Sequence, residues 1–222
     1  PLRSTLLQLS PPPLELCSLP SVQSKREAIE VELGCADAQF LFQLARRDPE
    51  THYVGIEIRD PLVDDVNARA REEGLSRLRA VYAHINVDLP ALFDGKKGIV
   101  RRFYINFPDP WWKRAHHKRR LITRELAVEL WELLRSDGEL FFQSDVFELA
   151  LDAMAVLEST PGFENASPAG EWSFCRQSPF PARSLREDRV ETRGLPVFRM
   201  LYRKTALPDH GALDKTPAPP PR

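Results

Sequence analysis

The chain has 222 residues, with 31 Lys and Arg against 32 Asp and Glu, so its formal net charge is −1. This length gives one domain with a substantial hydrophobic core and is too short for two domains of ordinary size. The near-zero charge excludes a globally basic protein, so any contact with a nucleic acid must come from an uneven distribution of charge.

Cysteine content argues against a disulfide framework and against a zinc site, because the three cysteines are far apart and odd in number. No apolar run reaches the length of a membrane span, and no basic start leads into a hydrophobic core. We therefore expect a cytoplasmic protein with no membrane partner and no resident metal.

Proline-rich segments flank the central part of the chain. Residues 1–25 are rich in Leu, Pro and Ser, include three consecutive prolines, and lack the periodicity of a helix or strand. Residues 207–222 have the same character and are expected to form a disordered tail. The predicted domain therefore covers residues 26–206, between an N-terminal extension and this tail.

Strands and helices are predicted to alternate along the domain. The expected strands are 27–33, 52–58, 78–82, 100–107 and 139–143, with two late strands around 172–176 and 197–203. The expected helices are 38–47, 61–73, 123–134 and 147–158. This alternation predicts an α/β fold, in which a mainly parallel seven-stranded sheet has helices on both faces. Ligands bind such sheets at the carboxyl ends of the strands.

The first two strands end in features typical of a nucleoside cofactor site. The first strand runs from Glu32 through the small-residue turn at Gly34 directly into a helix, which lets a ligand approach backbone amides closely. The second strand ends at Glu57, where a carboxylate can accept hydrogen bonds from both hydroxyls of a ribose. A dinucleotide site would require three glycines at the turn, so a nicotinamide cofactor is disfavoured.

Residues 101–121 combine an acidic turn with a strongly basic segment. Pro108 and Pro110 hold Asp109 in an extended backbone, so its carboxylate is presented rather than buried. Residues 113–120 contain five Lys or Arg, two His and no acid, a charge density that suits a polyanion. Trp111 and Trp112 add surfaces suited to base stacking. The alternative for the basic segment is a solvated loop without a partner.

This segment resembles the signature of the bacterial tRNA (guanine-N(7)-)-methyltransferase family, in which an F-P-D-P-W-x-K turn precedes a basic H-x-K-R-R segment. The matching residues are Phe107, Pro108, Asp109, Pro110, Trp111, Lys113, His116, Lys118, Arg119 and Arg120. The resemblance covers roughly residues 29–203 and implies a Rossmann-like class I methyltransferase fold. It also implies S-adenosyl-L-methionine as the cofactor, tRNA as the partner, and a monomer or homodimer.

The resemblance assigns Glu32, Gly34, Glu57 and Asn86 to the methyl-donor site. Asn86 takes the place of a family Asp after the third strand and would accept from the adenine amine, or it only caps a turn. The family usually has Glu-x-Gly-x-Gly after its first strand, whereas this chain has Ala36 and Ala38 where glycines are expected. Alanine fits there only if its φ is negative, which puts donor affinity in question.

The implied reaction is methylation of nitrogen 7 of a guanine in the tRNA variable loop. This nitrogen carries no hydrogen, so no strong base is needed. The enzyme must instead hold the ring in line with the methyl group and place negative charge where the purine becomes positive. Asp109 is the expected catalytic residue, acting as orienter and electrostatic stabiliser where cofactor and guanine meet.

The resemblance assigns five further residues to substrate binding: Lys113, Arg119, Asp145, Ser184 and Glu187. Asp145 follows the fifth strand and would read the guanine edge, although it could also cap the next helix. Arg186 replaces an aromatic residue of the family between Ser184 and Glu187. Two alternatives stay open at this point, a catalytically impaired RNA-binding protein of the same fold and a methyltransferase acting on another substrate.

Overall fold

The computed structural model of the protein describes residues 28–111, 120–167 and 173–207. The predicted N-terminal extension, nearly all of the predicted tail, and the basic residues Lys113 and Arg119 lie outside these ranges. Within the described ranges, the sheet and its helices form the frame that positions every other predicted site residue.

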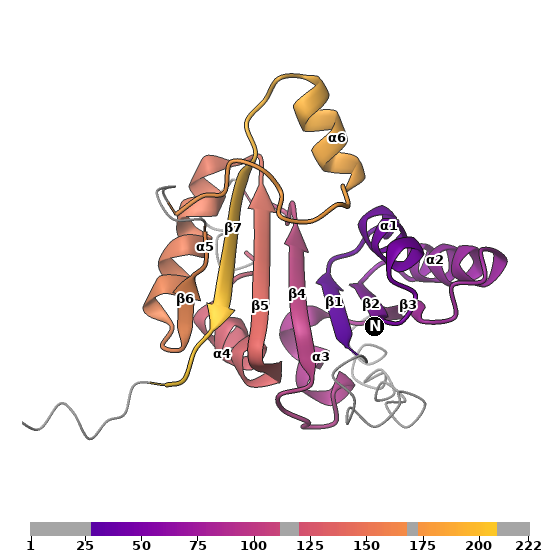
Figure 1. Ribbon diagram of the computed structural model, residues 1–222, viewed down its shortest axis with the longest axis horizontal. Helices are drawn as coiled ribbons and strands as arrows, with labels where there is room; N and C mark the ends of the chain where they lie inside the picture. Colours follow the sequence, from indigo (N-terminus) through magenta and orange to yellow (C-terminus); the bar gives the residue numbers. More distant parts are fainter. Residues whose placement is uncertain (1–27, 112–119, 168–172, 208–222) are drawn as a thin grey trace, which may run out of the picture.

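A seven-stranded sheet with the order β3-β2-β1-β4-β5-β7-β6 forms the centre of the molecule (Figure 1). Its strands are β1 (Ile29–Leu33), β2 (His52–Glu57), β3 (Leu78–Tyr82), β4 (Val100–Asn106), β5 (Leu134–Ser144), β6 (Phe163–Asn165) and β7 (Phe198–Lys204). Strands β1 to β5 are parallel, whereas β7 is antiparallel to both β5 and β6. The predicted α/β class and mainly parallel seven-stranded sheet are therefore confirmed.

Helices cover both faces of this sheet (Figure 1). On one face, α1 (Gln39–Arg47) and α2 (Asp60–Glu72) pack on β2 and β3. On the other face lie α3 (Ile85–Leu92), α4 (Arg124–Leu133) and α5 (Phe147–Ser159). The short helix α6 (Leu185–Thr192) lies beyond the carboxyl ends of β4 and β5 (Figure 1).

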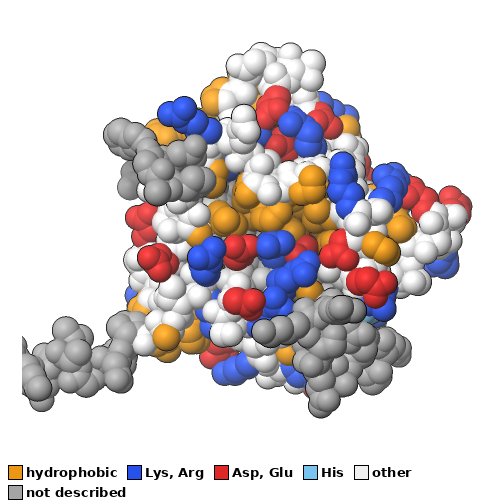
Figure 2. All heavy atoms as spheres, viewed as in Figure 1, with side chains coloured by type: hydrophobic (Ala, Val, Ile, Leu, Met, Phe, Trp, Pro, Cys, Tyr) orange, Lys and Arg blue, Asp and Glu red, His pale blue; other side chains and the backbone are white. Residues whose placement is uncertain are grey.

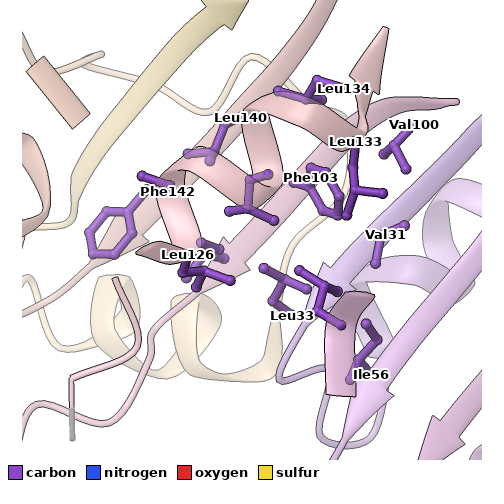
Figure 3. Packing of buried hydrophobic residues seen from close by; sticks show 14 of the residues in the cluster. Val31, Leu33, Ile56, Val100, Phe103, Leu126, Leu133, Leu134, Leu140 and Phe142 are labelled. Carbon is purple, nitrogen blue, oxygen red and sulfur yellow. The ribbon is translucent and has the colours of Figure 1, made fainter. Parts of the chain in front are cut away.

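The hydrophobic core has two layers because alternate strand residues point to opposite faces of the sheet. In one layer, Val31, Phe103 and Phe142 pack against Leu126 and Leu133 of α4 (Figure 3). The second layer lies under α1 and α2, where Phe40, Tyr104 and Phe141 are buried and Phe180 packs against them. Together the layers hold the central strands rigidly, so the carboxyl ends of β1, β4 and β5 are fixed relative to one another.

Three elements differ from the sequence-based prediction. Helix α3 is missed because it is short and contains Pro90, which normally marks a break. The predicted strand around 172–176 is wrong in its described part, where Cys175 makes only an isolated bridge to Arg199. The edge strand is instead β6, whose three residues are too few to show alternation.

Helix α6 is missed because it buries only Glu187 and Val190, too few residues for an apolar stripe.

Charged residues of alternating sign form a row across five strands on the face that carries α1 and α2. In the sheet register, Glu30 pairs with Arg102, Arg102 with Glu139, Glu139 with Arg203, and Arg203 with Glu164. Arg102 contacts Glu30 at 2.8 Å and Glu139 at 2.7 Å. Figure 2 shows acidic and basic side chains alternating over this part of the sheet, below an apolar patch. The opposite charges favour one register of the strands.

Candidate active site

A cleft of about 950 Å³ opens at the carboxyl ends of the parallel strands. It lies where the chain order reverses, since β2 and β4 flank β1 on opposite sides. Seven of the predicted site residues line it: Glu32, Gly34, Glu57, Asn86, Asp109, Asp145 and Ser184. The structure thus brings together residues that are spread over most of the domain sequence.

The turn after β1 keeps a left-handed backbone although two of its residues are alanines. Gly34 has φ 80, and Ala36 and Ala38 have φ 50 and 53. The premise that alanine fits this turn only with a negative φ is therefore wrong. A left-handed conformation costs a non-glycine residue about 1 kcal/mol. The Ala36 amide donates to Glu57 at 3.0 Å, a hydrogen bond that holds the strained turn against β2.

Glu57 is held as a carboxylate at the end of β2. Its oxygens accept hydrogen bonds from the backbone amides of Ala36, Ile58 and Arg59. The Arg59 guanidinium also donates to it, at 2.9 and 3.1 Å. Burial opposes ionisation, but the hydrogen bonds from Arg59 and the backbone outweigh it and lower the pKa of Glu57. Arg59 remains 61% exposed, so its side chain is free to move away when a hydroxyl-bearing ligand enters.

Glu32 presents a buried carboxyl group to the same cleft. Its Oε1 accepts from Asn106 at 2.7 Å, whereas Oε2 is buried with no hydrogen-bond partner among the described residues. Burial raises the pKa of Glu32 to about 8, although the Asn106 hydrogen bond acts in the opposite direction. A buried, unpartnered carboxyl oxygen that lines a cleft is suited to a cationic or hydrogen-bond-donating ligand.

Asn106 begins a hydrogen-bonded row that connects Glu32 with helix α6. Gln143 donates to Asn106 at 2.9 Å and to Glu187 at 3.1 Å, and Arg199 donates to Glu187 at 2.7 Å. Asn106, Gln143 and Arg199 are register neighbours on β4, β5 and β7. Sequence reasoning missed this row. A polar residue beside the apolar stretch of each of these three strands was the available signal.

Glu187 lies inside the protein rather than on the cleft. Its side chain is fully buried, and both carboxylate oxygens are used by Gln143 and Arg199. A direct contact with substrate, as the sequence resemblance implies, therefore stays a prediction. The observed contacts give Glu187 the role of anchoring α6 to the sheet.

Asp109 occupies an exposed turn between β4 and the basic segment. Phe107 and Trp111 have φ 51 and 45, so the backbone changes direction sharply on both sides of the Pro108–Pro110 turn. The Phe107 amide donates to the Gln143 carbonyl at 2.8 Å, which fixes the start of the turn against β5. The pKa of Arg59 is raised mainly by its hydrogen bonds to Glu57. The negative charge of Asp109 also raises it. Asp109 therefore faces the cleft near the Glu57–Arg59 pair.

Asp145 forms an ion pair and does not cap a helix. Its carboxylate accepts from Arg186 at 2.5 Å, and its side chain is 15% exposed. The Val146 amide donates instead to the Ser144 hydroxyl at 3.0 Å. Helix α6 starts at Ser184, whose hydroxyl accepts from the Glu187 amide at 3.1 Å. Ser184 therefore caps α6 while lining the cleft.

Asn86 lies in the first turn of α3 with an exposed side chain. Its amide group donates to the Leu121 carbonyl at 3.3 Å. The start of α3 is closed by Asp88, which accepts from the His84 amide at 2.7 Å. The alternative in which Asn86 only caps a turn is therefore not what the structure shows.

Arg120 closes the basic segment as a buried anchor. It is 6% exposed, donates to the Pro110 carbonyl at 3.2 Å, and forms an ion pair with Asp152 of α5. Both ends of segment 112–119 are therefore held together beside Asp109. The contacts observed for Arg120 are thus internal to the protein, whereas Lys113 and Arg119 lie outside the described residues.

Within the described ranges, no group of His, Cys, Asp and Glu side chains is arranged to hold a metal ion. In those same ranges, no helix is long and apolar enough to cross a membrane.

Comparison with known proteins identifies the family. A family model described as "Putative methyltransferase" matches residues 26–200. A tRNA (guanine-N(7)-)-methyltransferase of Synechococcus elongatus is 38% identical over 175 residues, which cover 78% of this chain and 80% of that protein. The enzyme of the same name from Trichormus variabilis is 35% identical over 182 residues, covering 82% and 83%. The chain belongs to the tRNA (guanine-N(7)-)-methyltransferase family.

Solved structures agree with this family fold. The aminoglycoside resistance methyltransferase NpmB1 matches with a TM-score of 0.51 and 16% identity, covering 80% of this chain and 87% of that chain. An rRNA methylase from Streptococcus thermophilus matches with a TM-score of 0.51 and 12% identity, covering 82% and 89%. At such identities the likeness shows the Rossmann-like methyltransferase fold alone. The family membership does not favour the alternative of an RNA-binding protein without catalysis.

Proposed function

We propose that this protein transfers a methyl group from S-adenosyl-L-methionine to nitrogen 7 of a guanine in the tRNA variable loop. The observation that carries the proposal is the convergence of Glu32, Glu57 and Asp109 on one cleft at the carboxyl ends of β1, β2 and β4. The relatives named above support the reaction and the substrate class.

The donor-binding part of the cleft fits the cofactor in charge and hydrogen-bonding capacity. Oε2 of Glu32 lacks a partner among the described residues and suits the ammonium of the amino-acid portion. Glu57 would accept from the ribose hydroxyls, and the Asn86 side chain would accept from the adenine amine. When bound, the cofactor supplies an electrophilic methyl group on a sulfonium. The protein's task is to hold that group next to the acceptor base.

Asp109 would orient the acceptor guanine. An exposed carboxylate can accept two hydrogen bonds from the pairing edge of guanine, and its charge stabilises the purine as methylation makes it cationic. Asp145 lines the same cleft after the neighbouring strand β5 and would contact the same base once Arg186 moves aside. Lys113 and Arg119 are proposed to bind the RNA backbone, so that tRNA lies across the cleft mouth. No residue acts as a general base, because nitrogen 7 loses no proton.

The direct test is to incubate the protein with unmodified tRNA transcripts and methyl-labelled S-adenosyl-L-methionine, and to map the label by cleavage at 7-methylguanine. We expect label at one guanine of the variable loop. Label elsewhere in the tRNA, or none in the presence of donor binding, would contradict the proposed acceptor.

Asp109→Ala should lower kcat by about 100-fold or more, because one preorganised electrostatic group is removed from the reacting centre. The affinity for tRNA should change less than threefold, since phosphate contacts dominate RNA binding. Asp137→Ala is a matched control, because Asp137 is an exposed residue at the turn near the amino end of β5. Near-normal turnover by Asp109→Ala would show that the catalytic role belongs to another residue.

A further inference from the structure

Helix α6 is a short polar helix that the sheet holds in place with one buried ion pair. Eight residues are too few for a helix to be stable alone in water, and only two residues of α6 are buried. Its main anchor is Arg199 on β7, which is 5% exposed and donates to the fully buried Glu187. Arg199 also pairs with Glu191 one turn further along. An arrangement of this kind positions α6 without giving it a hydrophobic face.

The acidic residues of α6 are all paired with cations from outside the helix. Glu187 pairs with Arg199, Asp188 with Arg183, and Glu191 with both of these arginines. The negative charge of α6 is therefore neutralised by Arg183 and Arg199.

The basic residues of α6 form a separate row. Arg186 and Arg189 of α6, and Arg193 in the C-cap position directly after it, are spaced three and four residues apart, so they share one side of the helix. All three are exposed. Arg186 pairs with Asp145, and Arg189 and Arg193 have no acidic partner within 4.0 Å in the part of the chain that the structure describes. Two uncompensated guanidinium groups therefore project from an anchored helix.

This arginine row lies at the cleft that holds Asp109. Arg186 and Arg189 line the cleft itself. A second, shallow hollow of about 250 Å³ continues along the helix and is lined by Asp188, Arg189, Thr192 and Arg193. A polynucleotide whose base enters the cleft must place its neighbouring phosphates near the cleft mouth. The row offers forked donors at that place.

We propose that Arg189 and Arg193 of α6 bind the tRNA backbone phosphates next to the target nucleotide, forming a second RNA-binding surface besides segment 113–119. This inference rests on the proposed function, because tRNA is the polyanion concerned. Neither the net charge of α6 nor the periodicity of its sequence indicates such a role. In this arrangement α6 aligns the RNA strand, and Asp109 orients the base.

The test compares the wild-type chain with the double variant Arg189→Ala/Arg193→Ala in filter binding of unmodified tRNA transcripts between 50 and 200 mM salt. Loss of two phosphate contacts should weaken binding about tenfold at low salt and reduce the slope of log affinity against log salt by about 1 to 2. The KM for tRNA should rise by a similar factor. The affinity for S-adenosyl-L-methionine should stay unchanged.

The matched control is Arg71→Ala/Lys96→Ala, which removes two exposed cations near the ends of α2 and α3, on the side of the sheet where β3 and β4 begin and away from the cleft. This control should keep the wild-type affinity and salt slope. Equal affinity and slope for the Arg189/Arg193 variant and the wild type would overturn the proposal. If the wild type binds tRNA but methylates none, the proposed function fails and the binding comparison still decides the role of α6. If the wild type binds no tRNA, this inference fails as well.

Discussion

At the scale of single residues, the protonation of the Glu32 carboxyl makes the stability of the folded protein depend on pH. Its pKa is about 8 in the folded protein, mainly because of burial and with further contributions from the charges of Asp37 and Glu57. The ordinary pKa of a glutamate carboxyl is 4.5. The folded state therefore keeps a proton that the unfolded chain loses above that value. Stability should fall as pH rises between the two values, since the folded state binds more protons there.

We expect the free energy of unfolding of the donor-free protein to decrease by about 1 kcal/mol per pH unit between pH 6 and 8 from this group. Glu32→Gln should remove that slope, and urea unfolding at several pH values measures it. The affinity for S-adenosyl-L-methionine should rise over the same range, because only the ionised carboxyl attracts the ammonium. The Gln variant should bind the donor at least tenfold more weakly above pH 8, about 1.4 kcal/mol. An unchanged pH slope in the variant would exclude Glu32 as its source.

Ala36 offers a second test at the residue scale, because its φ is 50. Ala36→Gly should raise the free energy of unfolding by about 0.5 kcal/mol, as relief of the left-handed strain exceeds the added chain entropy. Donor affinity should hold or increase, since the turn keeps its shape. Ala91→Gly is the matched control in α3 and should lower stability by about 1 kcal/mol. Destabilisation by both changes would mean that the strain at Ala36 is negligible.

At the scale of elements, the docking of α6 depends on one buried ion pair. Arg199→Met removes the cation and leaves Glu187 as an uncompensated buried carboxylate. The expected loss of stability is about 3 kcal/mol, measured by urea unfolding. Because α6 carries Ser184 and Arg189 at the cleft, the KM for tRNA should rise more than kcat falls.

Rescue of the same pair distinguishes charge from packing. Adding Glu187→Gln to Arg199→Met removes the unpaired charge and should recover about half of the lost stability. The tRNA affinity should recover with it if α6 has returned to its place. A double variant no more stable than Arg199→Met would show that the pair contributes through packing instead of charge.

The sequence predicts the elements that have a clear period and misses those that do not. Strands β1, β2 and β4 are short segments rich in β-branched and aromatic residues, and α1 has one apolar face, so their order and type follow from pattern alone. The cleft residues Glu32, Glu57 and Asp109 follow from the rule that ligands bind at strand ends. Asn106 and Gln143 could not be assigned, because their role depends on the register between β4 and β5, which no local pattern encodes.

At the scale of the whole molecule, the residues that stabilise the sheet and the residues that form the cleft lie at different positions along the same strands. The charged row through Arg102 lies several residues before the strand ends, whereas the row through Asn106 reaches the cleft. Both rows are on the same face, with Tyr104 and Phe141 between them. The row through Arg102 should therefore stabilise the sheet without affecting the cleft.

Arg102→Met tests this separation. Glu30 is 1% exposed and would keep Arg101 and Tyr104 as partners, while Glu139 would lose its buried contact. The free energy of unfolding should fall by about 2 kcal/mol, because the buried Glu30 loses one of its two cations and the 16% exposed Glu139 keeps only the 3.5 Å contact with Arg203. Arg203→Met, at the 58% exposed end of the row, should change it by less than about 0.5 kcal/mol. Thermal unfolding should stay a single transition in both, and KM for tRNA and donor affinity should match the wild type at temperatures below unfolding. Equal destabilisation by the two variants would show that burial does not set how much each ion pair contributes to stability. A raised KM for tRNA in Arg102→Met would show that the row through Arg102 and the row through Asn106 are coupled through the sheet.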